Sequence, residues 1–125
     1  MIIGIGSDIA RVPRFEAALA RHGERFPRRV LGDDEYRRLT RHAFPAAFLA
    51  KHFAAKEAFV KALGTGFRWG IQWRDIQVYN DSLGKPELAL SGQAAAVAQR
   101  AGVQASHLTL SDEADYALAF VVLER

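Results

Sequence analysis

The 125-residue sequence contains no cysteine, which excludes disulfide bonds and metal sites built from thiolates. It also lacks any apolar run approaching the roughly 18 residues that a membrane helix needs. The apolar start has no basic lead-in and is interrupted by Gly4, Gly6 and Asp8, unlike a signal peptide. These absences predict a cytoplasmic protein without a membrane segment.

Lysine is scarce, with four residues, and arginine supplies most of the positive charge. The planar guanidinium of arginine suits bidentate contacts with phosphate or carboxylate. The formal net charge of +3, taken alone, fits an ordinary basic surface equally well. The length predicts one domain covering residues 1–125, and its modest core favours association into an oligomer.

Hydrophobic periodicity predicts helices over residues 13–26, 32–39, 45–63 and 93–100, with Pro27 stopping the first and Gly64 closing the third. Strands are predicted over 2–9, 76–79, 87–91, 107–110 and 116–123, with turns at 80–86 and 111–115. This order predicts an α+β fold, with a largely antiparallel sheet packed against the long central helix.

Three arginines share one face of the first predicted helix. Arg14, Arg21 and Arg25 recur at spacings of seven and four, so they lie beside the apolar stripe of that helix. The pattern predicts a basic surface next to a packed one.

Charged residues interrupt an apolar part of the long helix. Glu57 and Lys61 are four residues apart, which by itself is typical of a solvated ion pair. Their neighbours are mostly apolar, and charges buried there need a partner or a metal. Asp8, at the predicted end of the first strand, either caps the next segment or joins Glu57. Two carboxylates beside a substrate phosphate would suit Mg²⁺.

Two further segments are candidates for phosphate contacts. Gly64, Thr65 and Gly66 follow the long helix, and glycine lets a backbone approach a phosphate closely. They match neither a Walker motif nor a dinucleotide fingerprint. His107 and Thr109 alternate on one face of a late strand, where a histidine is either a surface residue or a phosphate contact. No catalytic triad or zinc-spaced ligand set is evident.

In order, these positions resemble the holo-[acyl-carrier-protein] synthases, the small class of 4'-phosphopantetheinyl transferases. The likeness is carried by residues 3–9, 48–66, 80–86 and 107–124, and covers essentially the whole chain. The segment from Phe48 to Gly66 is similar to the family's central signature. His52 departs from the arginine, and Asp112 from the histidine, that many members carry.

The resemblance implies Mg²⁺-dependent transfer of the 4'-phosphopantetheine group from coenzyme A to a serine of apo acyl carrier protein, a step that serves fatty acid biosynthesis. The second product is adenosine 3',5'-bisphosphate. Asp8 and Glu57 would hold Mg²⁺, and Lys61 would neutralise charge on the transferred phosphoryl group. The base is either Glu57 or a metal-bound water. Coenzyme A would contact Lys56, Lys61, Gly64, Thr65, Gly66, Lys85, Pro86, His107 and Thr109.

The resemblance also implies that Arg14, Arg21 and Arg25 dock the acidic acyl carrier protein. It implies a homotrimer with active sites between subunits, and neither nucleic acid nor membrane as a partner. One alternative is a basic domain that binds nucleic acid or an acidic protein without chemistry, although no RNA-binding signature supports it. Another is a family member that has lost activity, against which the intact acids and Lys61 argue.

Overall fold

The computed structural model describes residues 1–125. The strands are β1 (Ile2–Arg11), β2 (Ile76–Asn80), β3 (Pro86–Leu90), β4 (Ala105–Glu113) and β5 (Tyr116–Glu124). The helices are α1 (Val12–His22), α2 (Arg25–Val30), α3 (Asp33–Thr40), α4 (Pro45–Leu63) and α5 (Gly92–Arg100), with a short 3-10 turn, η1, at Trp73–Asp75. No helix combines the length and the apolar character that a bilayer crossing requires.

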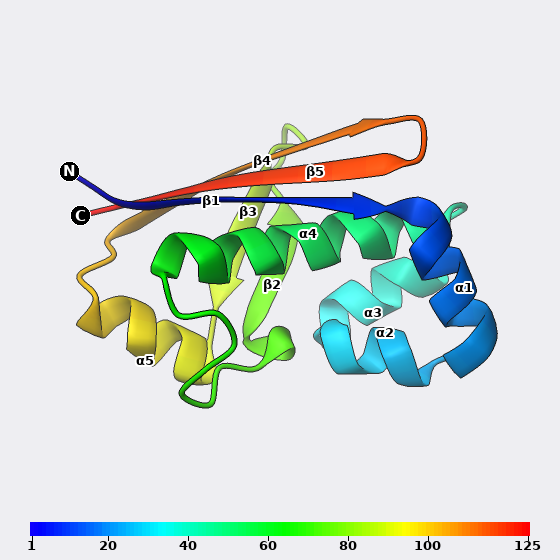
Figure 1. Cartoon of the computed structure of the whole chain (residues 1–125), viewed down its shortest axis with the longest axis horizontal. Helices are drawn as coiled ribbons and strands as arrows, with labels where there is room; N and C mark the ends of the chain where they lie inside the picture. Colours follow the sequence, from blue (N-terminus) through cyan, green and yellow to red (C-terminus); the bar gives the residue numbers. More distant parts are fainter.

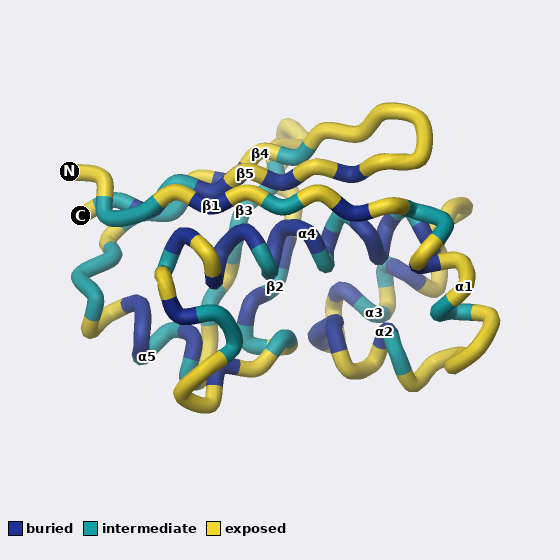
Figure 2. Tube along the Cα trace, in the orientation of Figure 1, coloured by how far each residue is buried: buried dark blue, intermediate teal, exposed yellow.

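The main sheet contains three antiparallel strands in the order β1-β5-β4, and β2 and β3 form a separate hairpin. Helix α4 runs along one face of the main sheet, against β1 and β5 (Figure 1). Buried and exposed residues alternate along β5, with alanine, valine and leucine on the buried side (Figure 2). The predicted α+β architecture, with a largely antiparallel sheet on a long central helix, is confirmed.

Strand β1 lies directly on the backbone of α4, because two of its inward positions are glycines. A Cβ atom at Gly4 would stand 1.8 Å from the carbonyl oxygen of Ala62, and one at Gly6 would stand 2.0 Å from that of Ala58. No side chain fits in either place, so glycine is required for this close approach. The contact holds β1 and α4 in a fixed relation.

The structure corrects the predicted ends of the first strand and the first helix. β1 continues to Arg11 through pairing with β5, so Asp8 lies inside a strand and does not cap the next segment. Helix α1 ends at His22, because Gly23 adopts a φ of 57°. Pro27 does not stop a helix but lies in the first turn of α2, where its missing N–H has no helical partner to lose.

The turn predicted over residues 111–115 is also wrong in most of its length. β4 extends to Glu113, since residues 111–113 pair with residues 116–118 of β5. The chain reverses at Ala114, which has a φ of 51°. Residues 111–115 are mostly polar because this end of the hairpin is exposed, and such a polar run predicts a longer turn than the structure has.

Candidate active site

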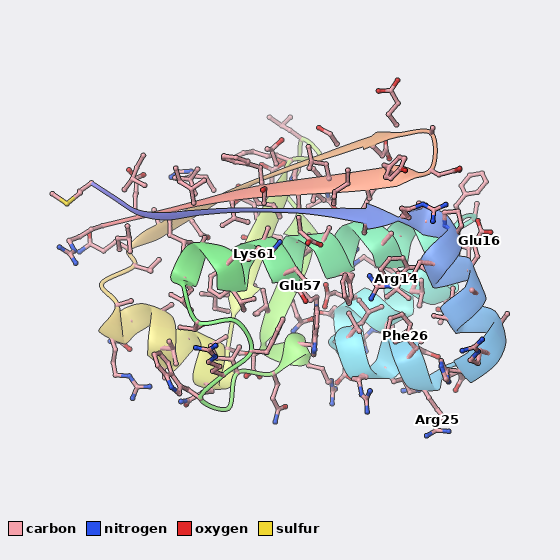
Figure 3. The ribbon with its side chains drawn as sticks, viewed as in Figure 1. Arg14, Glu16, Arg25, Phe26, Glu57 and Lys61 are labelled. Atoms are coloured by element: carbon pink, nitrogen blue, oxygen red, sulfur yellow. The ribbon has the colours of Figure 1, made fainter.

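The candidate site lies at the free edge of β1, the outer strand of the main sheet, beside the middle of α4. Asp8 is on the α4 side of β1, and its side chain is 17% exposed. Glu57 and Lys61 stand one turn apart on α4, with Arg14 approaching from α1 (Figure 3). Four charged side chains from three elements thus gather at this edge.

Lys61 links the helix to the strand. Its Nζ donates to the carbonyl oxygen of Ser7 at 3.0 Å and to Oδ1 of Asp8 at 3.2 Å. The Lys61 side chain is 52% exposed, so its ammonium group can move toward a ligand without leaving a buried position.

The two carboxylates of the site influence each other. Partial burial raises the pKa of Glu57, and the charge of Asp8 raises this pKa further. Lys61 and Arg14 act in the opposite direction without cancelling the shift. Asp8 and Glu57, distant in sequence, are therefore close in space, and their repulsion favours a bound cation.

Lys56 precedes Glu57 in sequence but points into the protein, where it is fully buried. Its Nζ donates to Oε1 of Glu35 at 2.7 Å and to the carbonyl oxygens of Val30 at 2.7 Å and Trp73 at 3.1 Å. These contacts use all three hydrogens of the ammonium group. Burial lowers the pKa of Lys56, and Glu35 opposes that shift. The predicted contact between Lys56 and coenzyme A does not fit this placement.

The segment predicted to cradle a phosphate closes the end of α4 instead. The N–H groups of Gly64, Thr65 and Gly66 all point to the carbonyl oxygen of Val60, at 3.0, 3.2 and 3.3 Å. The Thr65 hydroxyl donates to the carbonyl oxygen of Gly66 at 2.8 Å. In this conformation the three amides are turned toward the helix, which does not fit the predicted phosphate cradle.

The other residues predicted to bind coenzyme A lie apart from the acids. Lys85 pairs with Glu87 at 3.3 Å on the β2–β3 hairpin, where Pro86 begins β3. His107 and Thr109 are exposed on the face of the sheet turned away from α4, and Nε2 of His107 lies 2.7 Å from Oε1 of Glu124. Within one chain, these residues do not meet Asp8 and Glu57.

Pro86 lines a hollow of about 690 Å³ with several cations that the sequence analysis did not single out. Arg38, Arg41 and Lys51 border this Pro86 hollow, together with Asp112, which pairs with Lys51 at 2.5 Å. In the sequence, isolated basic residues of this kind cannot be distinguished from a solvated surface. The aspartate that departs from the family pattern therefore has a cationic partner in this chain.

His52, the other departure, also borders the Pro86 hollow and is almost fully buried. Its ring stacks on Phe48 with centroids 3.9 Å apart, and Nδ1 lies 2.9 Å from the Phe48 carbonyl oxygen, which can only accept a hydrogen bond. Burial lowers the pKa of His52 to about 3. The ring is therefore neutral near pH 7 and cannot supply the positive charge of an arginine.

Two of the three predicted docking arginines meet in a basic hollow of about 430 Å³ on α1 and α2. This basic hollow is lined by Arg14, Ala18, His22, Arg25, Phe26 and Arg29. The prediction that all three arginines share one face of a single helix is wrong, because α1 ends at His22 and Arg25 lies on α2. Arg21 stays on α1 but does not line the basic hollow. Arg29 was missed because Pro27 was expected to end the helix before it.

Comparison with known proteins gives a consistent result. Residues 4–121 match the model of the 4'-phosphopantetheinyl transferase superfamily. The holo-[acyl-carrier-protein] synthase of Klebsiella pneumoniae (strain 342) is 52% identical over 123 residues, which are 98% of each chain.

Solved structures extend this similarity to the fold. The crystal structure of the synthase from Neisseria meningitidis has a TM-score of 0.95 at 40% identity, with both chains covered completely. The synthase from Bacillus anthracis, solved in complex with CoA (3',5'-ADP), has a TM-score of 0.81 at 36% identity, covering 98% of this chain and 96% of that one. The chain belongs to the holo-[acyl-carrier-protein] synthase family of 4'-phosphopantetheinyl transferases.

Proposed function

We propose that this chain transfers 4'-phosphopantetheine from coenzyme A to a serine of apo acyl carrier protein. The observation that carries the proposal is the meeting of Asp8, Glu57 and Lys61 at the edge of β1, in a chain of this family. The serine oxygen would form a bond to the phosphorus that carries pantetheine. The bond from that phosphorus to the bridging oxygen breaks, and adenosine 3',5'-bisphosphate leaves.

The donor set of the site fits a divalent cation with oxygen ligands, and we propose that Asp8 and Glu57 hold Mg²⁺. Burial raises the pKa of Glu57 and the charge of Asp8 raises it further, and positive charge between the two carboxylates would relieve both effects. Mg²⁺ typically takes one or two carboxylates and completes its ligands with water and substrate phosphate. When bound, the ion would stabilise the charge on the pyrophosphate during transfer.

The remaining groups have roles in positioning and proton transfer. Lys61 would turn its exposed ammonium group from Asp8 toward the transferred phosphoryl group and neutralise its charge. Glu57, beside Asp8 at the edge of β1, is the candidate on this chain to accept the proton of the carrier serine. Little covalent chemistry is needed, because phosphoryl transfer depends mainly on alignment and charge stabilisation.

The basic hollow supports docking of an acidic carrier protein beside this site. Arg14 and Arg25 line it, and Arg29 adds a third cation. The charge of Arg14 offsets part of the rise in the pKa of Glu57, so the hollow and the acids adjoin each other. A carrier held there would present its serine close to the carboxylates, and electrostatic attraction would speed its approach. Because coenzyme A and the carrier are shared with fatty acid synthesis, we place the reaction in the cytoplasm.

We further propose that the active assembly is a homotrimer with sites between subunits. The sheet face turned away from α4 carries a patch of exposed apolar side chains: Ile5, Ile9, Tyr116, Leu118 and Phe120. A contiguous apolar patch of this kind marks an interaction surface. Thr109 pairs with Phe120 on this face, so a neighbouring chain there would bring His107 and Thr109 to another subunit's site.

The function is tested by incubating the protein with apo acyl carrier protein, coenzyme A and Mg²⁺, and weighing the carrier by mass spectrometry. The expected result is a gain of one phosphopantetheine group, lost on adding EDTA and restored by excess Mg²⁺. An unchanged carrier, in a reaction where the Klebsiella pneumoniae relative modifies the same preparation, would contradict the proposal.

The assembly is tested by light scattering after gel filtration. Wild-type protein should elute with the mass of three chains, and Phe120→Asp, which places a charge in the apolar patch, should shift it toward one chain. A monomeric wild-type protein with full transfer activity would exclude the trimer while leaving the reaction intact.

A further inference from the structure

We infer that the buried ion pair between Lys56 and Glu35 positions the carrier-docking helices relative to Glu57 in the transfer reaction. The inference rests on the proposed function and adds a positioning role for two residues that do not touch the substrates. Both side chains are completely enclosed. We call this feature the Lys56–Glu35 pair.

The first step is that Glu35 uses both of its oxygens, as Lys56 uses all of its hydrogens. Oε1 accepts the Lys56 ammonium and also the N–H of Gly32, at 2.9 Å. Oε2 accepts the N–H of Val78 in β2, at 3.0 Å. The pair therefore bonds to backbone groups outside its own two helices, and each bond has a direction.

The second step is that these backbone groups form the corner between α2 and α3. Val30 is the last residue of α2, and its carbonyl oxygen accepts from Lys56. Gly32 immediately precedes α3, and its N–H donates to Glu35. An ammonium at a helix carbonyl end and a carboxylate at a helix amide end both have the favourable sign. The corner between α2 and α3 is thus built on the Lys56–Glu35 pair.

The third step connects this corner to the reaction. Helix α2 carries Arg25 and Arg29 of the basic hollow, and it ends on the Lys56 ammonium. On α4, Lys56 is followed directly by Glu57. One buried contact therefore joins the helix that presents docking arginines to the helix that presents a carboxylate of the active site.

Stability alone does not account for the charges of this pair. Apolar residues of similar volume usually stabilise a core as well as a buried ion pair does. The ion pair differs because its hydrogen bonds are directional, so they hold α2, α3 and α4 in one arrangement. A misplacement of about 1 Å far from the reacting atoms can lower a rate about 100-fold, so such an arrangement matters for catalysis.

The test uses Lys56→Met, Glu35→Gln and the double variant Lys56→Met/Glu35→Leu, in the full chain with coenzyme A, Mg²⁺ and apo acyl carrier protein. We expect kcat/KM for the carrier to fall about 100-fold in each variant. The Kd for coenzyme A with Mg²⁺, measured by calorimetry, should stay within about twofold. Asp8 on β1 and Glu57 on α4 are held together by the direct contact between these two elements, which the substitutions do not remove. Asp33→Asn, which removes the exposed Arg74–Asp33 pair, is the matched control and should behave as wild type.

The double variant separates positioning from stability. Its apolar pair removes the unpaired buried charge that each single variant leaves, so the melting temperature should recover part of the loss. The carrier defect should persist, because the backbone groups of Val30, Gly32 and Val78 still lack their partners. Recovery of carrier kinetics together with stability would overturn the inference, as would equal losses in coenzyme A affinity and carrier kinetics. If Lys56→Met fails to fold, Glu35→Gln and the double variant give the same comparison. A wild-type chain that transfers nothing would instead refute the proposed function, and the inference with it.

Discussion

Lys56 and Glu57 are adjacent on α4, yet the helix turns them to opposite environments. Lys56 faces inward, where every hydrogen of its ammonium group has an acceptor. Glu57 faces the edge of β1, where burial and Asp8 raise its pKa. The charge of Lys56 is therefore fully satisfied within the fold, whereas the charge of Glu57 keeps an unfavourable interaction that a ligand can relieve.

The largest effect should come from the neutral isosteres Asp8→Asn and Glu57→Gln. Each keeps the shape of the site but removes a charge that would bind the metal, so kcat/KM should fall roughly 1,000-fold. Mass spectrometry of the carrier at saturating Mg²⁺ measures the loss, and circular dichroism checks the fold. Full activity in both variants would show that the acids do not hold the ion.

Next in size is the effect of Lys56→Met on folding. The change leaves Glu35 buried without its cation, so the free energy of unfolding should fall by about 3 kcal/mol. Urea unfolding provides the measurement, with Lys61→Met as the control on the same helix. Lys61 is about half exposed, so its loss should alter stability by less than about 1 kcal/mol. Equal losses of unfolding free energy in the two variants would contradict the expected difference between the buried Lys56 and the half-exposed Lys61.

A smaller effect is expected from the buried His52, whose Nε2 lies 3.7 Å from Oε2 of Glu35. Its folded pKa of about 3 lies below the unfolded value, so its stabilising contribution is present above roughly pH 6.5 and is lost as the pH falls. Protonation of the unfolded chain should remove about 2 kcal/mol at pH 5. His52→Gln can still donate to the Phe48 carbonyl and lacks this titration. Urea unfolding at pH 7 and pH 5 should therefore show a smaller decline in the variant than in wild type.

The smallest effect is a gain in stability from Glu57→Gln without metal. A carboxyl whose folded pKa is raised contributes most when protonated, and its ionisation destabilises the fold above the unfolded pKa. At pH 7 the amide should raise the melting temperature by about 2 °C, and the difference should vanish below roughly pH 3, where the acid is protonated in both states. A thermal melt in EDTA measures this. A lower melting temperature at pH 7 would indicate that Glu57 stabilises the empty site.

Local signals in the sequence were sufficient for α4, because Pro45 can occupy the first turn of a helix and Gly64 adopts the left-handed conformation that ends one. The opposite orientations of Lys56 and Glu57 were not predictable. Glu35, which determines the buried position of Lys56, lies on another helix, and spacing within a helix indicates only neighbours three or four residues away. Long-range contacts therefore limited the prediction more than secondary structure did.

The same reason explains the errors around Asp8 and the arginines. The continuation of β1 beyond Asp8 depends on pairing with β5, more than one hundred residues later in the chain. The membership of Arg29 in the basic hollow depends on how α2 turns back after Gly23. The expectation that Asp8 and Glu57 act together came only from the family resemblance and the chemistry of two acids, since no sequence spacing joins them.

Gly4 and Gly6 leave no room for a side chain between β1 and α4. The gap between the two acids is consequently set by two main chains in contact, so rotamer changes elsewhere in the core cannot widen it. At the proposed metal site, discrimination among ions of different radius would then be a main-chain property. A single methyl group added at Gly6 would stand 2.0 Å from the carbonyl oxygen of Ala58, so it would push β1 away from α4 and separate Asp8 from Glu57.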